Sequence, residues 1–576
     1  MRGRSGAAAL AVLSSLVLAL GPACPHPAVP VKAPGPAAGE ADEKLREEVQ
    51  KLSAEAEALL REQNERIWAT WTAGQKPQIS ASYQGHAALF TPENIHKIEK
   101  LRQRAKEPAE IRALTSLLSH FVGEYLASQL SELTDAVSNL EGSATFTAQG
   151  KEYAYRELDR LLASERSAAR RRALWEGATA AVQRISASVR LREERKAELL
   201  AGLGYPSHEA YGAELRQVDP AQLALLAEQV LATTEQAYQQ VLERMSSLEV
   251  ELPRQQLRRC DFPRTFRTPA VDARFPAAEL VPRAELTVEG MGLKLSGLRN
   301  LKIDARDVAG KAARALAVGV DVPNDVRLSV RPLAGVRAQA ALMGEVGRAL
   351  HLAFTKPSMR FELRALGDGS AGAAYAFLFE DLVEDPIWLE EHAGFSGDGL
   401  DRYLATQAAI LLQRIRVTAG RILYELQLRR RGLQDAKELY GPIMSRAYGV
   451  PFGPDDEARA LVDLEDFYQS ADDFLAWFLA GQIQAQMKAR YGPAWWHNPA
   501  AAAFLEALWG RGQSVTAREV VGLIGEERLK PDVLLLRLST MLKVPISVPA
   551  NFGKEVEALP PPPAAPTPDA GTPDAG

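Results

Sequence analysis

The spacing of apolar residues is the feature that most constrains the fold of this chain. Between residues 42 and 71, Leu45, Val49, Leu52 and Leu59 recur at the three- and four-residue intervals of an amphipathic helix. Strand signals are sparse, and only 284–288 and 326–330 alternate apolar and polar residues as a small sheet would. We therefore expect a mainly α fold with a minor β element. The same helical spacing predicts further helices over about 98–126, 152–164, 167–200, 219–247, 303–317, 336–354, 374–392, 398–432, 434–447, 456–465, 468–490, 499–509, 516–525 and 530–542.

The composition is that of a globular protein, with 46% hydrophobic and 24% charged residues. The 68 basic and 73 acidic residues give a net charge of −5, so no basic field is present to bind nucleic acid. Two cysteines, Cys24 and Cys260, exclude a disulfide-rich scaffold and a cysteine-rich zinc module. Eight histidines are few for 576 residues, which matters for any metal site.

Both ends of the chain differ from the body. Residues 1–24 have a basic start, an apolar stretch and the sequence Leu-Gly-Pro-Ala-Cys, which resembles a bacterial lipoprotein signal ending at Cys24. Lipidation of Cys24, ordinary secretion and an uncleaved anchor are the three interpretations. We expect an exported protein of the cell envelope, anchored to a membrane through Cys24 and facing the periplasm or the exterior. Residues 25–42 predict a Pro/Ala-rich tether, 43–550 a helical domain, and 557–576 a disordered Pro-rich tail.

The segment 344–348, Gly-Glu-Val-Gly-Arg, has the register of the zinc motif H-E-x-x-H. That motif places two histidines on one face of a helix as zinc ligands, and its glutamate is the general base for the metal-bound water. Glu345 keeps the position of the base, whereas Gly344 and Arg348 stand at the two ligand positions. The motif is therefore degenerate.

Several segments around this motif resemble one family. Trp175, Gly204, Tyr205 and Tyr211 lie in a run of helices similar to that of the angiotensin-converting-enzyme (peptidyl-dipeptidase A) family of zinc peptidases. Residues 345–351 also look like the H-E-F-G-H-A-L-H motif of the oligopeptidase group. Further matches are LLREQNERIWATWTAG near the start and SADDFLAWFLAGQIQAQMKARYG near the end. The resemblance spans most of the body and implies a large, two-lobed, gluzincin-type helical fold with a central cleft.

The resemblance also assigns roles to individual positions. The third zinc ligand, a glutamate 13 residues before a proline, falls on Ala373, which is 13 residues before Pro386. Glu380, Asp381 and Glu384 are then out of register by about two turns or more. The oxyanion tyrosine falls on Phe474 and a substrate-binding tyrosine on Ala471. Only Glu345 survives, as a vestigial general base, so we expect no zinc cofactor and no activity by the family's mechanism.

Alternatives at these positions stay open. Arg348 either pairs with Glu345, three residues earlier on the helix, or both side chains point to solvent. A relocated metal site would use His351 and Glu345 together with Glu384 or His392 from the next helix. The turn 495–497, Trp-Trp-His, either stacks on a ligand or caps the helical core. The arginine runs 170–172 and 429–431 are either solvated helix faces or attract acidic partners or lipid headgroups.

Three functions are compatible with the sequence. The first is an envelope-anchored pseudopeptidase that has lost zinc and binds peptides or a protein partner in its cleft. The second is an active metallopeptidase, a peptidyl-dipeptidase or oligopeptidase, with unconventional metal ligands. The third is a helical lipoprotein with a structural or interaction role.

Overall fold

The computed structural model describes residues 36–75, 82–83, 85–86, 88–267 and 269–553. The expected signal segment with Cys24, most of the tether and the Pro-rich tail lie outside these residues, so lipidation at Cys24 stays a prediction. Within the described ranges, no helix combines the length and apolar character needed to span a bilayer.

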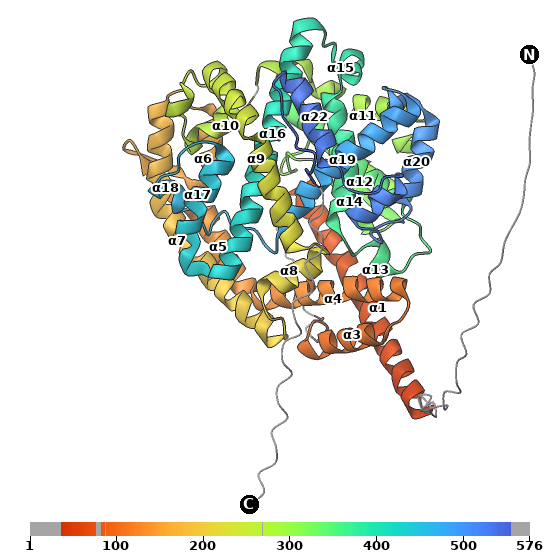
Figure 1. Ribbon diagram of the computed structural model, residues 1–576. Helices are drawn as coiled ribbons and strands as arrows, with labels where there is room; N and C mark the ends of the chain where they lie inside the picture. The colour runs from red at the N-terminus through yellow and green to blue at the C-terminus, as the bar shows by residue number, and fades with distance from the viewer. Residues whose placement is uncertain (1–35, 76–81, 84, 87, 268, 554–576) are drawn as a thin grey trace, which may run out of the picture.

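Helices make up most of the described chain, as the apolar spacing predicts (Figure 1). The predicted helices over 336–354, 398–432, 468–490, 499–509 and 530–542 are confirmed to within one or two residues. The observed helices are α1 (Pro36–Ala73), α3 (Pro92–Arg104), α4 (Pro108–Gln129), α5 (Ser131–Ser143), α6 (Leu158–Ser164), α7 (Ala168–Gly202), α8 (His208–Arg216), α9 (Pro220–Glu249), α10 (Phe262–Thr265), α11 (Leu280–Gly290), α12 (Val336–Phe354), α13 (Phe361–Arg364), α14 (Gly369–Glu380), α15 (Pro386–Ala393), α16 (Gly397–Arg431), α17 (Ala436–Tyr448), α18 (Pro454–Glu457), α19 (Gln469–Tyr491), α20 (Pro499–Trp509), α21 (Ala517–Leu523) and α22 (Pro531–Leu542).

The described strands form a hairpin and a three-stranded sheet. The hairpin pairs β1 (Thr145–Ala148) with β2 (Lys151–Ala154) in antiparallel fashion. The sheet has the order β3-β5-β4, in which β5 (Asp325–Ser329) is parallel to β3 (Leu301–Asp304) and antiparallel to β4 (Leu316–Asp321). The strand predicted over 326–330 is thus confirmed as β5.

Two predictions of element type are wrong. Residues 284–288 belong to helix α11, whose buried side chains Leu280, Arg283, Ala284, Thr287 and Val288 follow the helical period. Over five residues that period cannot be told from strand alternation. Residues 303–317, predicted as a helix, contain the end of β3 and the start of β4.

Prolines divide or shorten other predicted helices. Residues 98–126 are split between α3 and α4, with Pro108 at the first position of α4. Residues 374–392 contain α14, a 3₁₀ turn over Asp381–Glu384 and α15, which begins at Pro386. Residues 456–465 contain only the end of α18, followed by turns.

The buried apolar residues form one large cluster and two smaller ones. The large cluster includes α9, α12, α14, α16 and α19, while a second joins α1, α3 and α4 and a third lies under β1, α6 and the start of α7. Helices α12 and α14 pack especially closely. A Cβ atom on Gly347 would lie 2.5 Å from the Tyr375 carbonyl oxygen, so only glycine permits this approach.

Candidate functional site

The degenerate zinc motif lies where α12 packs against α14. Gly344 faces Ala376 and Glu380, Gly347 faces Tyr375 and Ala376, and the His351 ring lies against Gly372. As the residue numbers increase along α12, those of the contacting residues in α14 decrease, so the two helices run antiparallel. Helices α14 and α19 also pack together within the large core, which brings α19 to the same region (Figure 1).

Gly344, at the first ligand position, lies beside a carboxylate. A Cβ atom on Gly344 would be 3.4 Å from Oε2 of Glu380. Glu380 stands seven residues after Ala373, about two turns out of the register that the resemblance implies, and its carboxylate nevertheless lies beside Gly344. Ala373, which the resemblance implies at the third ligand position, is buried and offers only a methyl group. The α14 residues that face Gly344 are Ala376 and Glu380, which lie about one and two helical turns after Ala373.

Glu345 and Arg348 form the ion pair that their spacing allows. Nε of Arg348 is 3.5 Å from Oε2 of Glu345, whose side chain is 13% exposed against 42% for Arg348. The same Oε2 atom accepts a hydrogen bond of 2.8 Å from the backbone N–H of Ala317 in β4. The surviving carboxylate therefore joins the sheet to α12. This second contact could not be predicted from the sequence, because it depends on tertiary packing.

A second ion pair extends the site to α16. Nη1 of Arg414 lies 3.6 Å from Oε1 of Glu380, and the two side chains are 44% and 30% exposed. Burial raises the pKa of Glu380, and Arg414 opposes that rise. The Arg414 guanidinium also lies over the ring of Trp477, 5.1 Å from its centroid, and that ring packs on Phe377. Sequence reasoning missed both Arg414 and Trp477, although Trp477 stands in the segment that carries the family resemblance.

Asp473 of α19 lies near the same arginines as these two ion pairs. Desolvation raises the pKa of Asp473, while the positive charges of Arg414, Arg348 and Arg314 lower it. Three arginines from different parts of the chain therefore act on one carboxylate that reaches solvent. We call Arg314, Glu345, Arg348, Glu380, Arg414, Asp473 and Trp477 the arginine–carboxylate site.

Phe474 and Ala471 lie in the core. Both are fully buried, and the Phe474 ring makes an edge contact with Phe478 at 5.1 Å between centroids. Neither residue has a polar side-chain atom. They provide no hydrogen-bond donor at the positions where the resemblance implies an oxyanion donor and a substrate-binding group.

The residues of the alternative metal site do not converge. His351 is buried, its Nε2 lies 3.1 Å from the Gly512 carbonyl oxygen, and burial lowers its pKa to about 4. Burial and the charge of Asp381 raise the pKa of Glu384 to about 8. His392 packs against Trp388 at 4.8 Å. In the part of the chain that the structure describes, no three His, Cys, Asp or Glu side chains are grouped to hold a metal ion.

The residues at the degenerate motif do not fit zinc. Gly344 and Ala373 have no side-chain donor atom, and Arg348 brings a positive charge that repels a cation. Glu380 is a single carboxylate at this point, and it is paired with Arg414. A zinc site with an open position needs three protein ligands.

Other features that the sequence singled out have structural roles. Trp495 and Trp496 are fully buried, so this turn belongs to the core, while His497 pairs with Glu391 at 2.9 Å on the surface. Surface hollows of about 360, 450 and 350 Å³ lie elsewhere: between α7 and α17, beside α4, and between α3 and the α7–α8 turn.

No protein-family model matches the chain, and no curated protein matches it significantly. The likeness to zinc peptidases therefore depends on the sequence segments quoted above.

Proposed function

We propose that the protein is an envelope-anchored pseudopeptidase that binds peptides, or a peptide segment of a protein partner, without cleaving them. On this proposal the helices form the two-lobed body with a central cleft that the resemblance implies, and the arginine–carboxylate site contacts the bound peptide. The observation that carries the proposal is the contact of Arg348 with Glu345 at 3.5 Å, because it puts a guanidinium where a zinc ligand would stand.

These contacts argue against cleavage by the zinc mechanism. A general base must be free to accept a proton from an activated water. Glu345 instead contacts Arg348 and accepts the Ala317 N–H, so its carboxylate is engaged in the fold. Loss of an oxyanion donor, such as the hydroxyl absent from Phe474, costs about 10²–10³ in rate by itself.

The remaining groups suit peptide binding. The side chains of Arg348 and Arg414 are 42% and 44% exposed, and the ion pair that each makes with a glutamate is longer than 3.4 Å. Guanidinium groups bind carboxylates and backbone carbonyl oxygens through several N–H donors. We therefore propose that the preferred peptides present a carboxylate, either an acidic side chain or the C-terminus.

Retention of a random-sequence dodecapeptide mixture on the immobilised protein, followed by mass spectrometry, tests this proposal. Wild type should retain an intact, carboxylate-rich subset, and Arg348→Gln or Arg414→Gln should reduce retention at least about tenfold, since a charge-assisted hydrogen bond contributes about 1.5–3 kcal/mol. The matched control is Arg430→Gln, an exposed arginine paired with Glu209. Equal retention by all variants, or none by wild type, would leave a structural lipoprotein as the better function.

An active metallopeptidase with other ligands lacks support among the described residues, because no group of three metal-ligating side chains is present there. Envelope anchoring through Cys24 is a separate part of the proposal. Mass spectrometry of the protein isolated from membranes checks it, since lipidation adds acyl chains at a Cys24 N-terminus.

A further inference from the structure

The segment that leads into α19 has an unusual backbone. Phe467 and Tyr468 are consecutive residues with φ values of +49° and +56°, in the left-handed region. Bulky L residues rarely adopt this conformation, because their Cβ atom is crowded against the backbone there. The surrounding structure must therefore hold this turn in place.

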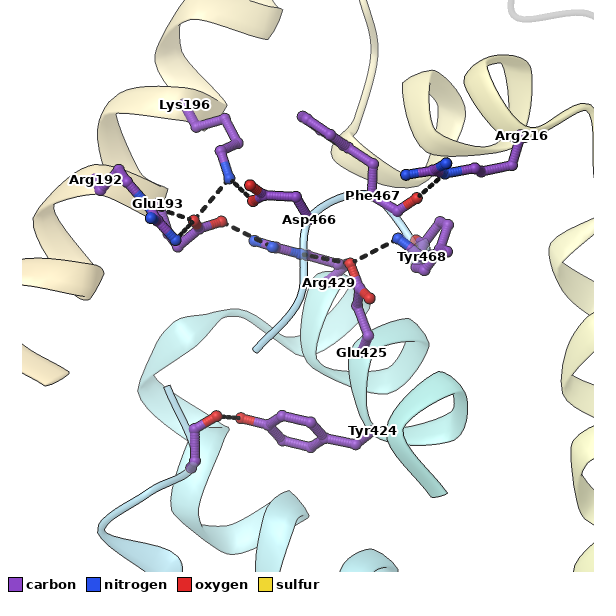
Figure 2. A network of polar contacts seen from close by, with 11 residues as sticks. Arg192, Glu193, Lys196, Arg216, Tyr424, Glu425, Arg429, Asp466, Phe467 and Tyr468 are labelled. Atoms are coloured by element: carbon purple, nitrogen blue, oxygen red, sulfur yellow. Dashed lines mark hydrogen bonds and ion pairs between the residues drawn. The ribbon is translucent and has the colours of Figure 1, made fainter. Parts of the chain in front are cut away.

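Contacts from two helices hold the turn. Nε of Arg216, the last residue of α8, donates to the Phe467 carbonyl at 3.0 Å, and the Tyr468 N–H donates to Oε1 of Glu425 in α16 at 3.2 Å (Figure 2). The Phe467 ring stacks on His208 at 4.3 Å. The Tyr468 ring lies so close to α8 that a Cβ atom on Gly212 would come within 2.8 Å of it.

Glu425 shares one guanidinium with a second buried carboxylate. Arg429 lies 2.8 Å from Glu193 and 3.9 Å from Glu425, and Glu193 also contacts Lys196 at 2.7 Å (Figure 2). All four side chains are no more than 6% exposed. Three cations contact Glu193, because Arg192 also lies 3.3 Å from it, whereas Glu425 has only the longer contact to a guanidinium that is already paired. Ionisation therefore favours Glu193 over Glu425.

The pKa shifts of Glu193 and Glu425 agree with this geometry. Lys196 and Arg429 outweigh burial and lower the pKa of Glu193 to about 2, whereas burial raises the pKa of Glu425 to about 8. Glu425 is therefore largely protonated near neutral pH. The charged and titratable groups around it come from four parts of the chain. Helix α7 brings Arg190, Arg192, Glu193 and Lys196, and α8 brings His208 and Glu209. Helix α16 brings Tyr424, Arg429 and Arg430, and the segment before α19 brings Asp463, Glu465, Asp466 and Tyr468.

We propose that Glu425 is a proton-dependent latch on the start of α19. With its proton, the carboxyl group accepts the Tyr468 N–H and keeps the left-handed turn closed. When Glu425 ionises, its negative charge is buried beside the Arg429 guanidinium, which is already paired with Glu193. Hydration of Glu425 then requires the covering segment 465–468 to move away, and Phe467 and Tyr468 relax to ordinary backbone conformations as it does so.

The latch acts on the helix that carries the arginine–carboxylate site. Asp473 lies five residues after Tyr468, in the first turns of α19, and the neighbouring Asp472 is paired with Arg216. Opening of the turn would remove the contacts that fix these residues. Opening of segment 465–468 depends on Glu425 and on the backbone of the turn, whether or not the arginine–carboxylate site binds peptides.

Hydrogen–deuterium exchange of segment 462–472, corrected for the intrinsic pH dependence of amide exchange, tests the latch. In wild type, protection should fall at least about tenfold between about pH 6.5 and about pH 9.5, on either side of the value of about 8. Glu425→Gln, which mimics the protonated group, should stay protected at both pH values. The control Asp401→Asn removes an exposed carboxylate of the same helix and should behave as wild type.

Either of two results would overturn the latch. One is equal loss of protection in wild type and in Glu425→Gln. The other is unchanged protection of the segment in wild type over the whole pH range, which decides the question even where the Glu425→Gln variant does not fold.

Discussion

At the scale of single residues, the contacts of Glu345 are structural. Its carboxylate, for which the sequence resemblance implies the role of a general base, accepts the Ala317 N–H and contacts Arg348. The sequence predicts the Arg348 contact, because a spacing of three residues puts both side chains on one helical face. It could not predict the bond to Ala317 or the approach of Glu380 to Gly344, because both depend on how distant segments pack.

Removing the Glu345 carboxylate should therefore destabilise the fold. Glu345→Ala leaves the Ala317 N–H without its acceptor, and we expect a loss of about 1–3 kcal/mol in the free energy of unfolding. Glu345→Gln keeps an acceptor oxygen and should lose less. Urea denaturation measures both, with Glu289→Ala, an exposed glutamate of α11, as control. Equal stability of all three variants would mean that the contact to β4 contributes nothing.

Protonation of His351 should make the protein less stable in acid. Its pKa is lowered from 6.5 to about 4 by burial, so the unfolded chain binds a proton between these values and the folded chain does not. Its stability contribution is complete above about pH 6.5 and falls as the pH drops toward about 4. His351→Gln should flatten the pH dependence in this window in thermal denaturation. An unchanged slope would contradict a buried, neutral His351.

At the scale of elements, periodicity was a good guide to long helices and a poor one to short segments. Helix α12 has the predicted bounds, because nineteen residues define a helical period clearly. The five residues 284–288 fit both periods and form part of helix α11. Residues 303–317 form strand and loop, because pairing of β3 and β4 with β5 overrides their local helical pattern.

Two glycine-to-alanine substitutions at the contact between α12 and α14 should have different effects on stability. Gly347→Ala would place a methyl group 2.5 Å from the Tyr375 carbonyl oxygen, which can move only with the backbone of α14. We expect a loss of about 1–3 kcal/mol, typical of overpacking. Gly344→Ala meets the flexible end of Glu380 at 3.4 Å and should be neutral or slightly stabilising.

Thermal denaturation of these two variants gives the comparison directly. Both substitutions add the same methyl group to the same helix, so differences in helix propensity cancel. A lower melting temperature for Gly344→Ala than for Gly347→Ala would contradict the packing of these helices.

At the scale of the whole molecule, buried ion pairs connect helices that are distant in sequence. Arg171 pairs with Asp261 and Arg429 with Glu193, and all four side chains are 6% exposed or less. The interpretation of both arginine runs as solvated faces is therefore wrong for these two residues. The sequence alone could not show that Arg429 is buried and Arg430 exposed, because adjacent arginines on a helix differ only in the direction in which their side chains point.

Substitution of these neighbours should have unequal effects. Arg429→Gln removes one of the buried charged contacts of Glu193, which keeps Lys196, and should cost about 1.5–3 kcal/mol, as expected for the loss of a hydrogen bond between charged groups. Arg430→Gln removes an exposed pair with Glu209 and should cost less than about 1 kcal/mol. Guanidinium chloride denaturation is unsuitable because its salt screens charges, so urea is the denaturant of choice. Similar losses in both variants would contradict a central role for the buried pair.

The most direct test of the central claim combines peptide retention with metal analysis of the same sample. The purified protein is incubated with the dodecapeptide mixture, with and without a chelator, and the peptides and the bound zinc are both quantified. The account predicts intact peptides, retention that the chelator does not change, and no stoichiometric zinc. Stoichiometric zinc together with peptide cleavage that the chelator abolishes would contradict it.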